Sequence, residues 1–198
     1  MSEFFISLLS FSLLSTFSPG GATTLATASG AQFGVARSVP LLAGIAVGLA
    51  SLVGTAALGL GSITSALPQL ELVLRVVGSA YFLWLAWTIG RQGAPAEKAH
   101  GDATPIGFTT GLLLLWVNPK GWTMAISAAG SFARLTNSPV ELAAVLAMVF
   151  GLSAALSLTF WCIGGVWIAR TITTGAGWRT LNVSLAFLLV ISVAMLWL

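Results

Sequence analysis

A lysine lies near the middle of a long apolar segment, where a charged side chain is costly. Lys120 belongs to the stretch 106–133, and a lysine at the centre of a membrane helix costs roughly 2.5 to 3.5 kcal/mol on insertion scales. Its ammonium group is suited to binding a substrate carboxylate, because ionisable residues inside apolar spans usually serve a function. The alternative is that Pro119 ends a helix early and the lysine extends to the polar interface. We favour the binding role.

The residues around Lys120 repeat a pattern found one hundred positions earlier. The sequence PGGAT at 19–23 corresponds to PKGWT at 119–123, and five of the twelve positions in 19–30 are identical in 119–130. Proline inside a helix removes a backbone donor and clashes with the preceding turn. The alternative is that such a break is only a kink. In lipid, however, it persists only where protein or a water-lined cavity satisfies the freed carbonyls, and paired breaks in two halves indicate the binding site of a secondary transporter.

We therefore predict a substrate site between the two breaks. The backbone amides after Gly21 would face a carboxylate, because the N-terminus of a helix attracts anions. Asn118 would either contact the substrate or cap the helix that begins at Pro119, and Asn followed by Pro favours the cap. The predicted substrate-binding residues are Pro19, Gly20, Gly21, Thr23, Thr24, Asn118, Pro119 and Lys120.

Composition defines the class of protein. The chain of 198 residues is 57% hydrophobic and 7% charged, with a mean hydropathy of +0.99, which predicts an all-α polytopic membrane protein in contact with the lipid bilayer. The few basic residues are scattered, whereas nucleic-acid binding needs a clustered basic face. A single cysteine, Cys162, and a single histidine disfavour a disulfide, a dithiol redox pair or a metal site. We expect no cofactor.

Six segments are long enough to cross a bilayer, which takes about 20 mostly apolar residues. They form one transporter domain, 1–198, with halves at about 1–90 and 105–198 and a hydrophilic loop at about 91–104. Three spans per half is an odd number, so the halves would be inverted repeats, with the first and fourth spans broken by the Pro/Gly motifs. The predicted spans are Phe4–Ala28, Val39–Leu67, Leu70–Gly90, Ile106–Ala133, Val140–Ala169 and Leu181–Leu198.

Basic residues predict the orientation. Loops after the first, third and fifth spans carry most of them, namely Arg37, Arg91, Lys98, Arg170 and Arg179, and the opposite side carries Arg75 and Arg134. The positive-inside rule then places the richer set in the cytoplasm and both termini outside, in the periplasm.

A stripe of small residues follows one face of the second span. Small residues allow helices to approach closely, within the fold or at a homodimer contact. We expect packing, rather than substrate contact, for Gly44, Gly48, Ser51 and Thr55.

Taken in order, the motifs resemble the LysE/RhtB family of amino-acid exporters over essentially the whole chain. The third span and the tail from Leu181 are most similar to the branch that exports cysteine and O-acetylserine. The family's first break commonly reads Pro-Gly-Pro, whereas this chain has Pro19-Gly20-Gly21. The resemblance is carried by Pro19-Gly20, GAQFG at 30–34, LLAG at 41–44, GSAYFLWLAW at 78–87, GFTTG at 107–111 and LWVNPK at 115–120.

The resemblance implies a bacterial inner-membrane antiporter that exports a small neutral amino acid, of the cysteine/O-acetylserine, homoserine or threonine type, in exchange for protons. It would work by alternating access, and it is not an enzyme. All five acidic residues lie near span ends or in loops, so the sequence shows no mid-depth carboxylate to relay protons. A metal-ion exporter of the same superfamily shape and a membrane-embedded enzyme remain alternatives, although clustered oxygen or thiolate ligands are absent from the sequence pattern.

The orientation can be tested by cysteine labelling in a background without Cys162. A cysteine at position 98 should be shielded from an impermeant thiol reagent in intact cells, and one at position 137 should be labelled, because the basic loops stay in the cytoplasm. The reverse pattern would overturn the orientation.

Overall fold

The computed structural model describes residues 2–60, 68–91, 105–194 and 197, and these residues form helices without a strand. Their bounds are α1 Ser2–Phe17, α2 Gly21–Thr55, the π-helical turn η1 Ala56–Leu60, α4 Pro68–Gly90, α5 Phe108–Trp116, α6 Pro119–Ser131, α7 Pro139–Thr171 and α8 Gly175–Ala194.

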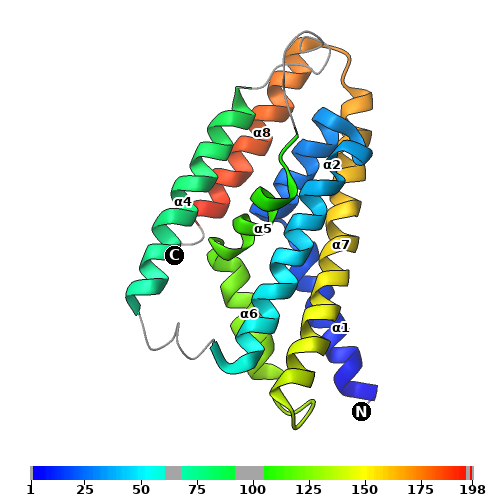
Figure 1. Ribbon diagram of the computed structural model, residues 1–198. Helices are drawn as coiled ribbons and strands as arrows, with labels where there is room; N and C mark the ends of the chain where they lie inside the picture. Colours follow the sequence, from blue (N-terminus) through cyan, green and yellow to red (C-terminus); the bar gives the residue numbers. More distant parts are fainter. Residues whose placement is uncertain (1, 61–67, 92–104, 195–196, 198) are drawn as a thin grey trace.

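Two helical segments are interrupted where the repeated motifs occur. Helix α1 ends at Phe17 and α2 begins at Gly21, and α5 ends at Trp116 and α6 begins at Pro119. In Figure 1, α1 and the first part of α2 rise through the molecule, whereas α5 and α6 descend through its centre. The two interrupted segments therefore run in opposite directions.

Helix α2 folds back on itself at Gly34. Gly34 has φ 76° and ψ 172°, a region that essentially only glycine adopts. The hydroxyls of Ser29 and Ser38 lie 2.7 Å apart, although nine residues of straight helix would separate them by about 13 Å along the axis. The segment is thus a helical hairpin, and its turn is visible at the top of Figure 1.

The hairpin corrects two expectations from the sequence. The first span was predicted to end at Ala28 and the second to begin at Val39, with Arg37 in a connecting loop. Helical structure instead continues to Phe33 and resumes directly after Gly34, so Arg37 lies on the second arm, where it is exposed. The buried hydroxyls of Ser29 and Ser38 form a hydrogen bond with each other across the two arms, so these polar side chains are satisfied without contact to solvent. The third span was predicted to begin at Leu70, whereas α4 already begins at Pro68.

Among the described residues, three helical stretches are long and apolar enough to cross a membrane: Gly21–Gly59, Pro139–Thr171 and Gly175–Ala194. Shorter apolar helices cover Phe4–Phe17 and Val76–Gly90. These helices make the chain a multi-pass membrane protein. Lys98, most of the hydrophilic loop and the side chain of Arg75 lie outside the described residues.

Helix α2 is the centre of the packing. It lies against α7 and α5, while α4 and α8 form a pair on the opposite side in Figure 1. The contacts depend on glycines, because a Cβ at Gly30 would overlap the backbone of Cys162, and one at Gly165 would overlap that of Thr27. Close backbone approach of this kind is typical of helix pairs in membranes, and it fixes α2 firmly against α7.

The backbone conformation at Gly34 generates a stability prediction. Gly34→Ala should lower the free energy of unfolding by about 1–3 kcal/mol, because a side chain is strained at this φ and ψ. Thermal unfolding of the purified protein in detergent measures the loss. Gly164→Ala is the matched control, since this helical glycine has open space around its Cβ position. Equal unfolding midpoints for the two variants would contradict the assigned hairpin.

Candidate functional site

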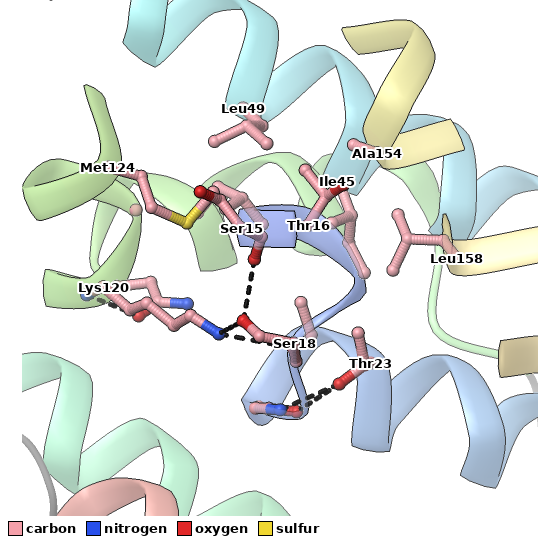
Figure 2. A pocket seen from close by; sticks show the side chains of 16 residues that line it. Ser15, Thr16, Ser18, Thr23, Ile45, Leu49, Lys120, Met124, Ala154 and Leu158 are labelled. Carbon is pink, nitrogen blue, oxygen red and sulfur yellow. Dashed lines mark hydrogen bonds between the residues drawn. The ribbon is translucent and has the colours of Figure 1, made fainter. Parts of the chain in front are cut away.

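A cavity lies where the two helix breaks meet (Figure 2). Its empty volume, including the open solvent at its mouth, is about 460 Å³. One wall is polar and comes from the end of α1, the start of α2 and the second break. The other wall is apolar and consists of Ile45, Leu49, Leu115, Met124, Ala154 and Leu158.

Lys120 joins the two breaks. Its side chain leaves the first turn of α6 and reaches the end of α1, where Nζ donates to Ser18 Oγ at 2.7 Å, to Ser18 O at 3.3 Å and to Pro19 O at 3.4 Å. A cation is favourable at this place because the C-terminus of a helix carries partial negative charge. Lys120 therefore lies at the cavity, as Figure 2 shows.

Helix α7 satisfies the other carbonyls at the end of α1. Ser157 Oγ donates to Thr16 O at 2.8 Å, and Trp161 Nε1 donates to Phe17 O at 3.3 Å. The last carbonyls of a helix have no partner within it. In this protein the last two carbonyls of α1 are bound by side chains of α7, and the carbonyls of Ser18 and Pro19 directly after the helix are bound by Lys120 of α6. The second half of the chain thus supplies donors to the first break.

The start of α2 is stabilised locally. Thr23 Oγ1 accepts a hydrogen bond from Gly20 N and donates to Gly20 O, both at 2.9 Å. Gly21 packs against Phe82 of α4, and a Cβ at Gly21 would overlap that ring. Thr24 is buried, but it does not line the cavity. Thr23 therefore shapes the turn that precedes α2.

The second break is organised by its own neighbours. Asn118 Oδ1 accepts a hydrogen bond from Lys120 N at 3.0 Å and caps α6, with Pro119 in its first turn. Trp122 Nε1 donates to Trp116 O at 2.8 Å, which satisfies a carbonyl at the end of α5. Gly78 of α4 lies against the backbone of this break. The cap directs the chain so that the Lys120 side chain points towards α1.

Five of the eight predicted substrate-binding residues line the cavity: Gly20, Gly21, Thr23, Asn118 and Lys120. Pro19 and Pro119 shape the breaks without lining the cavity, and Thr24 lies behind it. The prediction omitted three hydroxyl residues at the end of α1, namely Ser15, Thr16 and Ser18, which also line the cavity. Their clustering directly before Pro19 was an available signal.

The small-residue stripe of α2 faces α5. A Cβ at Gly44 would overlap the backbone of Phe108, and one at Gly48 would lie 2.8 Å from Leu112 O. Ser51 accepts a hydrogen bond from Trp116 Nε1 at 3.1 Å, and Thr55 is half-buried at the end of the helix. Gly44 and Gly48 thus lie at a contact between helices of the same chain.

The cavity has the chemistry of a binding site for a small polar molecule. Lys120 is the one charged side chain among its lining residues, and these include four hydroxyl residues and no carboxylate. Within the described parts of the chain, no group of His, Cys, Asp and Glu side chains could hold a metal ion. The cavity is therefore suited to a molecule that is anionic at one end, polar beside it and small enough for an apolar wall.

Comparison with known proteins gives a consistent result. The family model of the LysE type translocators matches residues 13–197. A cysteine/O-acetylserine efflux protein of Klebsiella pneumoniae is 33% identical over 185 residues, which cover 92% of this chain and 91% of the relative. Proteins of the same name from Salmonella paratyphi A and Escherichia coli are 28% and 26% identical, each over 91% of this chain and 90% of the relative. No solved structure matches.

The contact between Gly21 and Phe82 can be tested by a pair of substitutions. Gly21→Ala should lower the midpoint of thermal unfolding, because the new methyl group overlaps a ring that is only 2% exposed and overpacking typically costs 1–3 kcal/mol. Phe82→Leu should restore part of this loss when it is combined with Gly21→Ala. If the losses in unfolding midpoint of the two single variants simply add in the double variant, Phe82 of α4 does not contact the first break at Gly21.

Proposed function

Because the chain belongs to the family of LysE type translocators, we propose that it exports a small neutral amino acid or a close derivative across the bacterial inner membrane. The relatives named cysteine/O-acetylserine efflux proteins support substrates of that type, with homoserine and threonine as near alternatives of similar size. The protein is a translocator by family, and transport across a membrane agrees with its apolar helices.

The observation that carries this proposal is the position of Lys120 at the cavity between the two breaks. A zwitterionic amino acid needs a partner for its carboxylate, and Lys120 is the one cation among the lining residues. The start of α2 adds favourable electrostatics, because the first amides of a helix point outwards and attract an anion. The apolar wall formed by Leu49, Met124 and Leu158 would accommodate a short side chain.

Transport would use two inverted three-helix repeats. The opposite directions of the interrupted segments α1–α2 and α5–α6 support this arrangement (Figure 1). In such carriers the two repeats rock against each other around a fixed central site. With both termini in the periplasm and six spans, the central cavity would open alternately to each side of the membrane.

The coupling ion would be the proton, as the family resemblance implies. Among the residues that line the cavity there is no carboxylate, so the usual acidic relay would have to be replaced. Lys120 and the surrounding hydroxyls are the groups at the cavity that can exchange protons.

Counterflow in proteoliposomes tests the proposed function. Vesicles loaded with unlabelled O-acetylserine or cysteine should accumulate the labelled compound transiently, because a carrier exchanges substrate across the membrane. Loading with lysine should give no accumulation, since the cavity lining offers no anionic group to pair with a second ammonium group. Equal, non-saturating uptake of every amino acid would indicate a channel and would refute the proposal.

The role of Lys120 gives a sharper prediction. Lys120→Met should abolish export while the protein remains in the membrane, because the substitution removes the charge and keeps most of the apolar stem. Lys120→Arg should recover little, since a planar guanidinium does not replace a compact ammonium. Export is measured at matched membrane levels of each variant. Full export by Lys120→Met would show that this lysine has no part in binding.

A further inference from the structure

The ammonium group of Lys120 already has a complete set of acceptors. An ammonium group has three N–H donors, and three oxygens of the first break lie within hydrogen-bonding distance of Nζ: Ser18 Oγ, Ser18 O and Pro19 O. In this conformation no donor of Lys120 is left for a substrate carboxylate. Binding of a carboxylate therefore requires Lys120 to leave at least one of these oxygens.

The three oxygens form a site built for a cation. Ser18 Oγ donates its own proton to Ser15 O at 2.8 Å, so its lone pairs point towards Nζ, as the dashed lines in Figure 2 show. The two carbonyls follow directly after α1, next to the C-terminal end of the helix, which carries partial negative charge. Gly20 lacks a side chain, and a Cβ there would lie 3.1 Å from Nζ. The site thus has a fixed acceptor geometry and space for an ammonium group.

We propose that the end of α1, formed by Ser18 and the carbonyl of Pro19, is the binding site for the primary ammonium group of the transported molecule. Lys120 occupies this site in the structure, and the substrate replaces it. The inference rests on the proposed function for the identity of the ligand as an amino acid.

The exchange satisfies every charged group of both partners. The carboxylate of the entering zwitterion attracts Lys120 away from α1, and the substrate ammonium takes the three vacated oxygens. Without the exchange, the substrate ammonium would find no carboxylate among the lining residues, and an unpaired buried charge is strongly unfavourable. In the empty site Lys120 therefore supplies the hydrogen bonds to the three oxygens and connects the two breaks. When substrate binds, its ammonium group donates these hydrogen bonds instead.

This arrangement predicts selectivity for a primary ammonium group. Each N-methyl group removes one donor from the ligand, so a trimethylated ammonium leaves all three oxygens without a hydrogen bond. Recognition sites built around hydrogen bonds reject ligands that lack the donor, because their own polar groups are then left unpaired.

The first test uses the purified protein in detergent and needs no transport. Lys120→Ala vacates the site, so methylammonium should raise the thermal unfolding midpoint of this variant and should leave that of the wild-type protein unchanged. Tetramethylammonium should require a concentration at least about tenfold higher for the same shift, as expected for the loss of a charge-assisted hydrogen bond. Equal responses to the two cations in Lys120→Ala would overturn the proposal.

The second test keeps Lys120 and uses counterflow. In the wild-type protein, N-trimethylated substrate should compete at least about tenfold more weakly than the unmodified substrate. Ser18→Ala should raise the KM for the unmodified substrate, and Ser18→Thr, which keeps the hydroxyl, should restore it. Ser10→Ala is the matched control, because Ser10 is an exposed serine of the preceding helix α1 that does not line the cavity. Equal competition by both compounds would overturn the proposal.

The two tests separate the two proposals. If no amino acid shows counterflow but methylammonium stabilises Lys120→Ala selectively, the proposed function fails and the ammonium site remains supported. If counterflow occurs and N-methylation has no effect on competition, the transporter is supported and the ammonium site is wrong.

Discussion

A helix that stops inside a membrane leaves carbonyl groups that water cannot reach, and this constraint governs the site. At the end of α1 the carbonyls of Thr16 and Phe17 are bound by side chains of α7. The carbonyl of Ser18, directly after the helix, is bound by Lys120 of α6. An unpaired backbone group in hydrocarbon costs several kcal/mol. The need to satisfy the first break therefore brings α6 and α7 to it, and the cavity forms between them.

The two breaks are satisfied in different ways, although their sequences are similar. The second break is completed locally, by Asn118 at the start of α6 and by the indole of Trp122 on the carbonyl of Trp116. The first break depends on the other half of the protein. If the halves move apart, the carbonyls of the first break lose their hydrogen bonds to α6 and α7 and need new donors. The hydrogen bonds of the second break join neighbouring residues, so they can be kept during such a motion.

The sequence was sufficient for those features that local chemistry determines. Proline and glycine at 19–21 predict the first break, and Asn118 before Pro119 predicts the start of α6, because each acts on its own backbone. The reversal at Gly34 was missed, since a glycine in an apolar run looks like any other small residue of a membrane helix. The cluster of hydroxyl residues before Pro19 was a local signal, but the pairing of Ser18 with Lys120, 102 residues away, cannot be read from it. Long-range contacts of this kind have no periodic signal.

The distant donors of the first break also affect how the protein is made. Ser18 and Phe17 leave the ribosome 102 and 144 residues before their partners Lys120 and Trp161. At about 5–20 residues per second, the partners follow roughly 5–30 s later. During this interval the carbonyls of Thr16, Phe17 and Ser18 lack their final donors. The N-terminal segment therefore completes its folding only after α6 and α7 have been synthesised.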